Sequence, residues 1–311
     1  MRPATARRVR ALATLVVAAL ALTACSTTVN ETRNNAACGP FRSGATSDAV
    51  TARGTSSQGP TVRFPTPLRA AGSQVSVLRQ GSGAALADGE LARVGVSLFS
   101  GVDGSALQRI GYTKASVLPR QAGGTNSLDK SLLCRRVGER YALTSSAKSV
   151  FGAGAVAQLG LKDSSTLVLV VDVRARYPGK ADGVNQLQNG SLPAVVTAVD
   201  GQPGIVLPGS PAPKGERSAR VKAGGGATIA TRDRVLVKFS QFAWGATATV
   251  QNDQSWTNRT AFAIAAGTAS AEAPFGAKLV GERVGSQLLY VFPGQQAPTV
   301  WVVDVLGIIR G

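Results

Sequence analysis

Histidine is absent from the 311 residues, and the chain has three cysteines, one methionine and only 5% aromatic residues. Without histidine, the chain can build neither a Ser-His-Asp or Cys-His nucleophile nor a histidine-ligated zinc or haem site. The cysteines form no CxxC pair, and no P-loop is present. The sequence therefore predicts no metal site and no cofactor, and it excludes the enzymes that depend on those groups.

Long apolar runs are missing except near the N-terminus, where Ala11–Leu22 follows four arginines. This run is too short to span a membrane, and its order of charge and apolarity is typical of a secretory signal peptide, expected over residues 1–24. The sequence Leu-Thr-Ala-Cys at 22–25 resembles the lipobox of bacterial lipoproteins. The resemblance implies a diacylglyceryl group on Cys25, which would anchor the protein to the outer face of the bacterial cytoplasmic membrane. Cleavage nearby, giving a freely secreted protein, is the alternative.

Two cysteines remain after Cys25, in a compartment that permits disulfides. We expect Cys38 and Cys134 to form a bridge that holds the N-terminal segment against the middle of the first domain. Two buried free thiols are the alternative.

Acidic residues are scarce: 34 Lys and Arg stand against 17 Asp and Glu, a net charge of +17. Removing the four arginines of the leader leaves 30 basic residues and a net charge of +13. In an exported protein this excess indicates anionic lipid headgroups or envelope polymers as partners, and not nucleic acid, since no basic run is interleaved with aromatics. Solubility alone is the alternative explanation.

An internal repeat is the most informative feature. Val-Gly-Glu-Arg at 137–140 precedes a Thr-led apolar run ending Val-Val-Asp-Val at 170–173, and Val-Gly-Ser-Gln at 284–287 precedes a similar run ending at 302–305. Each copy is long enough to bury its own core, so we expect two complete domains. The second copy is about 15 residues shorter between these two segments.

Strands dominate the predicted secondary structure. Short β patterns predict strands at 74–78, 92–99, 140–145 and 166–174 in the first copy, and at 235–242, 286–292 and 300–306 in the second. One short helix is expected per copy, at 127–134 and at 275–279. The polar composition of residues 25–59 predicts a flexible tether, and residues 179–191 a linker. The fold class is therefore α+β, in which each domain, 60–178 and 192–311, is a twisted antiparallel sheet wrapped around one short helix.

The order of these elements is similar to that of the FKBP-type peptidyl-prolyl cis-trans isomerases. The shared features are a Gly-x-Gly turn, a Val-x-Val strand, an Asp-Gly turn, the Val-Gly-x-Arg step and an aromatic-Gly loop, here Phe151-Gly152. The resemblance covers roughly residues 74–176 and 217–309 and implies two FKBP-like domains. It also implies an apolar, aromatic cup for proline that lowers the barrier to X-Pro rotation, about 18–20 kcal/mol, without a nucleophile, an acid or a metal.

The resemblance places substrate-pocket residues in both copies. Those of the first copy are Leu98, Leu107, Gln108, Leu128, Phe151 and Leu169. Those of the second copy are Phe239, Val250, Gln251, Phe275 and Trp301. Most aromatic walls are replaced in the first copy, whereas the second keeps three but lacks the aromatic-Gly loop. No catalytic residue is assigned, and ordinary core packing is the alternative for the apolar positions.

The sequence thus predicts a membrane-anchored, peptidyl-prolyl isomerase-like lipoprotein that acts on or binds proline-containing segments of exported proteins, with activity that is weak or lost. A non-catalytic envelope adaptor or scaffold is the alternative. A solute-binding lipoprotein is disfavoured, because two-lobed solute receptors need many helices and few are predicted here.

Overall fold

The computed structural model describes residues 39–55, 59–113, 116–188, 190–245, 247–294 and 297–310. The expected signal peptide, Cys25 and Cys38 lie outside these residues. None of the helices in the described ranges is both long and apolar enough to cross a membrane.

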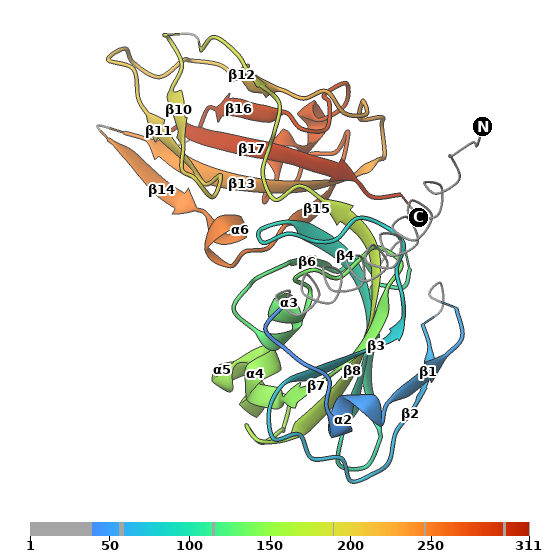
Figure 1. The fold of residues 1–311 in the computed structure, drawn as a ribbon. Helices are drawn as coiled ribbons and strands as arrows, with labels where there is room; N and C mark the ends of the chain where they lie inside the picture. The colour runs from blue at the N-terminus through green and yellow to red at the C-terminus, as the bar shows by residue number, and fades with distance from the viewer. Residues whose placement is uncertain are drawn as a thin grey trace, which may run out of the picture. The chain divides into compact units, whose positions relative to one another are not determined.

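Antiparallel sheet is the main regular structure of the described chain, and the helices are few and short (Figure 1). The first large sheet contains β3 (Gln74–Arg79), β4 (Leu91–Ser100), β5 (Ala106–Ile110), β6 (Pro119–Gln121), β7 (Arg140–Ser146) and β8 (Thr166–Tyr177). The second contains β9 (Val184–Asn185), β12 (Arg217–Ala223), β13 (Arg234–Trp244), β14 (Ala248–Asn252), β15 (Phe262–Ala265), β16 (Gln287–Phe292) and β17 (Thr299–Ile308). Two further strand pairs are β1 (Thr51–Arg53) with β2 (Thr61–Arg63), and β10 (Ala194–Thr197) with β11 (Pro203–Val206).

The two large sheets have the same strand order. The first runs β3-β7-β8-β4-β5 with β6 also paired to β4, and the second runs β12-β16-β17-β13-β14 with β15 also paired to β13. Even the register shifts correspond, since β3 and β12 each carry one, between Val77 and Arg79 and between Arg220 and Lys222. The repeat seen in the sequence is therefore a repeat of topology, to which the second sheet adds β9 beside β12.

The helices differ in number from the expectation of one per domain. They are α2 (Ala45–Asp48), α3 (Ser127–Ser131), α4 (Ala147–Phe151), α5 (Ala153–Gln158), α6 (Gln254–Thr257) and the 3₁₀ helix η1 (Pro274–Lys278). The expected helix near 127 is α3, whose first turn is capped by the Asn126 side chain, which accepts a 3.0 Å hydrogen bond from the Asp129 amide. The expected turn near 275 is η1. The added helices α4 and α5 occupy the loop that the second copy lacks.

Each sheet buries both faces. On one face of the first sheet, Tyr141, Leu143 and Leu169 pack with α3 and α4 side chains, and on one face of the second, Phe275 of η1 packs with Leu288 and Val303. The opposite faces are covered by chain from outside the repeat. Val50 and Leu68 pack on Phe99, Val168 and Val170 in the first sheet, whereas Leu192 and Val195 pack with Leu289 and Val302 in the second.

The described part of the N-terminal segment differs from the flexible tether expected over residues 25–59. Ser47 and Val50 are buried. The Thr46 hydroxyl donates a 2.6 Å hydrogen bond to Gln74, and the Ser47 hydroxyl lies 2.7 Å from that of Ser76. A polar composition suggested disorder, but these hydroxyls find partners on strand β3 that local sequence does not reveal.

The expected linker at residues 179–191 is likewise held in place, because β9 pairs with β12 and Ala181 is buried. Residues Pro40–Gly311 form one compact unit that contains both sheets. The division into two domains with boundaries at 178 and 192 stays a prediction.

Candidate functional site

Four of the six residues predicted for the first pocket lie together in the core of the first sheet. Leu98 on β4 and Leu169 on β8 are paired neighbours, and Leu128 and the half-buried Phe151 pack in the same cluster. Val150 and Val156, from α4 and α5, also belong to this cluster. The side chains of Val150 and Val156 therefore cover the face of the sheet where the cup for proline was expected. The remaining pair, Leu107 and Gln108, lies exposed on the edge strand β5.

The three aromatic residues predicted for the second pocket are in mutual contact. The ring of Phe239 lies 5.5 Å from that of Phe275 and 5.3 Å from that of Trp301, and the rings of Phe275 and Trp301 are 5.4 Å apart. The exposed fractions of the three residues are 4%, 0% and 3%. They come from β13, η1 and β17, so the sheet and the short helix together build an aromatic cluster. The predicted Val250 and Gln251 lie exposed on the edge strand β14 and do not join it.

Further rings, which the sequence analysis did not predict, extend this aromatic cluster. Phe262 on β15 lies 5.3 Å from Phe239, and Tyr290 on β16 stacks at 6.3 Å from Phe275. The signal for Tyr290 was the alternation of Leu288, Tyr290 and Phe292, which puts the three on one face of a strand. The buried Tyr290 hydroxyl has no hydrogen-bond partner, and burial raises the pKa of this phenol. The cluster thus has one unused donor at its edge.

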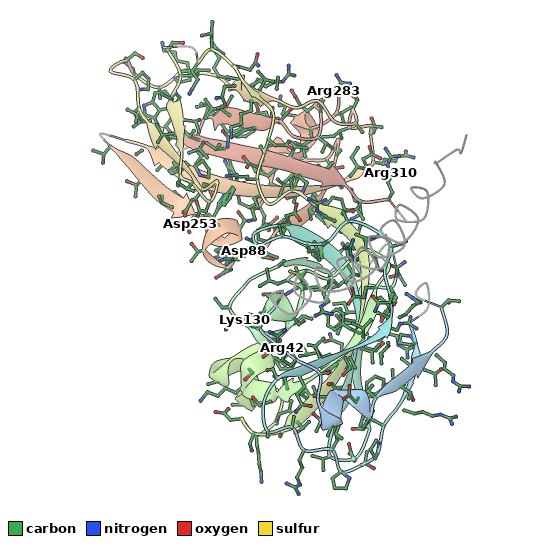
Figure 2. All side chains as sticks on the ribbon, viewed as in Figure 1. Arg42, Asp88, Lys130, Asp253, Arg283 and Arg310 are labelled. Carbon is green, nitrogen blue, oxygen red and sulfur yellow. The ribbon has the colours of Figure 1, made fainter. Side chains whose placement is uncertain are left out.

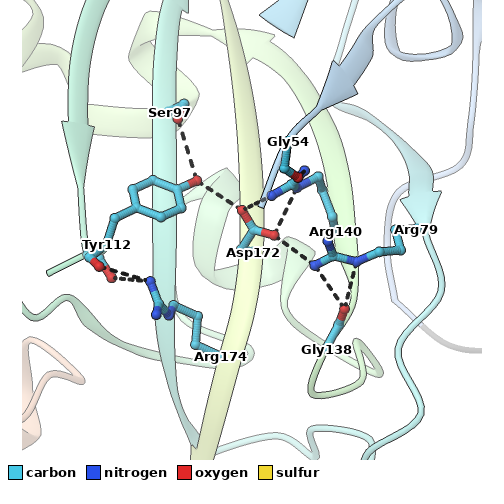
Figure 3. Close-up of polar contacts among 9 residues, drawn as sticks. Gly54, Arg79, Ser97, Tyr112, Gly138, Arg140, Asp172 and Arg174 are labelled. Carbon is cyan, nitrogen blue, oxygen red and sulfur yellow. Dashed lines mark hydrogen bonds and ion pairs between the residues drawn. The ribbon is translucent and has the colours of Figure 1, made fainter. Parts of the chain in front are cut away.

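The opposite face of the first sheet holds a buried ion network centred on Asp172 (Figure 3). Arg140, from the neighbouring strand β7, donates to both carboxylate oxygens, at 2.8 and 2.9 Å. Arg79 and the Tyr112 hydroxyl each donate at 3.1 Å. Arg140 also donates a 3.0 Å hydrogen bond to the Gly54 carbonyl, so the network fastens the N-terminal segment to the sheet. Its partners are all internal, which indicates a structural role.

The equivalent aspartate of the second sheet, Asp304, has lost its arginine. Gln287, at the position of Arg140, donates one hydrogen bond of 2.8 Å, and the Ala181 amide donates another of 2.7 Å. Burial raises the pKa of Asp304 to about 6, although these donors and the nearby lysines Lys222 and Lys238 favour its ionised form. The two copies therefore stabilise the equivalent buried carboxylate with different partners.

A second substitution accompanies this change. Gly95 faces Asp172 in the first sheet, and a Cβ atom there would lie 2.6 Å from the ring of Tyr112, which fills the space. Lys238 faces Asp304 at the corresponding position of the second sheet. Its ammonium lies 4.5 Å from the ring centre of Trp256 on α6. The first sheet thus has a Gly-Tyr pair at this place, and the second sheet has a Lys-Trp pair. The sequence analysis did not predict this difference, because each of these residues is ordinary in its own segment.

No group of three or more acidic or cysteine side chains in the described ranges is placed to hold a metal ion. Cys134 is disulfide-bonded. Because Cys25 and Cys38 both lie outside the described residues, the pairing with Cys38 stays a prediction.

No family model and no curated protein matches the chain. Solved structures to which it is similar include FkpA from Escherichia coli, at 22% identity and a TM-score of 0.30, over 34% of this chain and 49% of that one. Another is a peptidyl-prolyl cis-trans isomerase from Pseudomonas syringae pv. tomato, at 16% identity and 0.29, over 35% and 77%. A third is the three FKBP domains of wheat FKBP73, at 11% identity and 0.31, over 77% and 96%. The chain spans about half the length of FkpA. All three TM-scores are below 0.5.

Proposed function

We propose that this chain is an FKBP-like lipoprotein that binds proline-containing segments of exported proteins, with peptidyl-prolyl isomerase activity that is weak or lost. The observation that supports this proposal is the aromatic cluster of the second sheet, where Phe239, Phe275 and Trp301 lie within 5.5 Å of one another. An aromatic surface with one free donor, here the Tyr290 hydroxyl, is what holding a proline ring and a neighbouring carbonyl requires.

We expect the isomerase turnover to be weak because the side chains of the aromatic cluster are almost fully buried. Its three predicted members are at most 4% exposed, so a proline ring must displace side chains before it can bind. The first sheet offers leucines in place of aromatic walls, with α4 and α5 side chains packed against them. Stabilising a twisted amide needs a preformed surface, whereas slow, weak binding tolerates one that must open.

The test measures prolyl-peptide binding and isomerisation on the full chain. A Trp301→Ala variant should lose binding, and it should also lose about 3–5 kcal/mol of stability because a buried ring is removed. Trp244→Ala is the matched control, since Trp244 is a buried tryptophan of a different cluster. Its stability should fall similarly while binding at low temperature persists. If neither sheet binds any prolyl peptide, the envelope adaptor becomes the better proposal.

The anchoring belongs to the same proposal. A lipidated Cys25 would hold the sheets at the outer face of the cytoplasmic membrane, where exported chains emerge, and the mature net charge of +13 would favour anionic headgroups and envelope polymers. Mass spectrometry of the mature protein should show a diacylglyceryl group on residue 25. Cleavage downstream of this residue would end the lipoprotein proposal.

A further inference from the structure

A cavity of about 710 Å³, apart from the aromatic cluster, is lined by residues before β4, by β6, by the segment after β8 and by β13 and α6. Gln121, Lys238 and the segments around Glu90, Lys180, Asp200 and Trp256 line it. Its volume falls in the usual range for small-molecule sites, roughly 300–1,000 Å³. Asp88, labelled in Figure 2, stands at this cavity and accepts a 3.1 Å hydrogen bond from Arg259, just after α6.

Lys238 is the most deeply buried of the cations that line the cavity. The side chain is 2% exposed, and its ammonium donates a 2.8 Å hydrogen bond to the Gln121 side chain, which is also buried. In the described part of the chain, no carboxylate lies close enough to this ammonium to form an ion pair. A buried cation normally has an anionic partner or loses its proton, and burial does lower the pKa of Lys238, to about 8. At neutral pH a counter-charge from outside the chain would therefore be favourable.

Two N–H groups of residues beside Lys238 have no hydrogen-bond partner. The Nε1 of Trp256, a residue 7% exposed, and the Nε of Arg259 are both buried without a hydrogen bond. A buried N–H group that has no acceptor is unfavourable, because it has lost its hydrogen bond to water without gaining another. Both residues line the cavity that Lys238 lines. Trp256 and Arg259 thus each bring an N–H group without an acceptor to the lining that also contains Lys238.

The remaining charges restrict the chemistry of an occupant. Four carboxylates line the cavity, those of Asp88, Glu90, Asp182 and Asp200, against the three cations Lys180, Lys238 and Arg259. A dianion such as phosphate would meet repulsion from these carboxylates. A neutral sugar would supply no counter-charge for Lys238, and one face of Trp256 is already covered by the ammonium. A ligand with one carboxylate and additional N–H groups matches both sets of side chains.

We propose that this Lys238 cavity binds a short peptide through its free carboxylate, which pairs with Lys238 and accepts hydrogen bonds from Trp256 and Arg259, while peptide N–H groups face the acidic side chains. The site is independent of the aromatic cluster and of the proposed prolyl function.

The indole N–H resonances of the full chain test this proposal, because its three tryptophans give three cross-peaks that Trp→Phe variants assign. Tetra-alanine with a free carboxylate should shift the Trp256 cross-peak and leave that of Trp301 in place. Its C-terminal amide should bind about 10- to 100-fold more weakly, the effect of losing a charged hydrogen bond. Lys238→Met, which keeps length and apolar volume, should abolish this preference for the acid. Trp244→Phe, the control, should change neither affinity.

Other results would overturn the proposal. One is an unmoved Trp256 cross-peak at millimolar peptide. A second is acetate or maltose shifting that peak as far as the tetrapeptide does. A third is a preference for the acid that survives in Lys238→Met. A prolyl peptide that shifts Trp301 alone would support the proposed prolyl function without supporting this site, so the two can fail separately.

Discussion

Gln287 donates one hydrogen bond to Asp304, whereas Arg140, at the corresponding position of the first sheet, donates two to Asp172. Both aspartates are 1% exposed. One copy neutralises its buried carboxylate with a guanidinium, and the other relies on an amide, a backbone N–H and more distant lysines. The stability of the two sheets should therefore respond differently to mutation and to pH.

Replacing Arg140 by Gln should lower the free energy of unfolding by about 3–5 kcal/mol, since an unpaired buried charge would remain. The contact of Asp172 with the partly exposed Arg79 should keep the loss near the lower figure. Denaturant unfolding measures it. Arg63→Gln, at an exposed position of β2, is the control and should stay within about 0.5 kcal/mol. An equally small change for both variants would refute a stabilising role for the network.

The raised pKa of Asp304, about 6 against 3.8 for an ordinary aspartate, makes the fold pH-dependent. Because the folded-state pKa is the higher one, the contribution of this carboxyl to stability is largest below about pH 4 and is lost as the pH rises through about 6. Asp304→Asn does not titrate here. The stability of this variant relative to the unmodified chain should rise by up to about 3 kcal/mol between pH 4 and 7. A flat difference curve would contradict the assignment.

A methyl group at Gly95 should be poorly tolerated. The added carbon would lie 2.6 Å from the Tyr112 ring, which hydrogen bonds hold in place, so Gly95→Ala should destabilise the chain by about 1–3 kcal/mol. Gly154→Ala in α5 is the matched control, because a Cβ there meets no atom within 4 Å. It should gain about 0.5–1 kcal/mol from helix propensity. Thermal unfolding of both variants decides; equal transitions would disprove the steric argument.

A disulfide between Cys38 and Cys134 remains a prediction, supported by the bonded state of Cys134. Non-reducing peptide mapping should find the two residues in one linked fragment. Reduction should lower the free energy of unfolding by about 2–5 kcal/mol, because the closed loop restricts the unfolded chain. Recovery of an alkylated Cys38 from unreduced, unfolded protein would exclude the bridge.

Strand positions were predictable because the apolar pattern of each strand lies within one short stretch of contiguous sequence. The strand expected at 166–174 is β8, Thr166–Tyr177, and the one expected at 300–306 is β17, Thr299–Ile308. A run of Val and Leu between turn signals identifies a strand buried on both faces. The short helix near 127 was predictable for the same reason, since α3 consists of contiguous residues, Ser127–Ser131.

Other features depend on partners far along the chain. Val50, which helps to bury the outer face of the first sheet, lies in the segment 25–59 that local polarity predicted to be a tether. Ala181, in the segment 179–191 that was predicted to be a linker, is also buried. Lys238 stood in an apolar strand pattern, and its contact with Gln121 spans 117 positions. The local sequence around neither residue predicts this contact. Of the eleven pocket residues carried over by resemblance, seven lie in the two clusters and four lie exposed on the edge strands β5 and β14. Whether the clusters open depends on packing that sequence spacing does not express.

The segment between the repeats belongs structurally to the second sheet. Ala181 donates its amide to Asp304, β9 lengthens the sheet beside β12, and Leu192 and Val195 cover the outer face. A copy excised at residue 192 would lack the amide and β9, and would leave its buried aspartate short of a donor. The two halves are consequently no longer interchangeable modules. Reversing their order, or recombining either half with a relative at the repeat boundary, would separate the second sheet from the strand and amide that only the preceding segment provides.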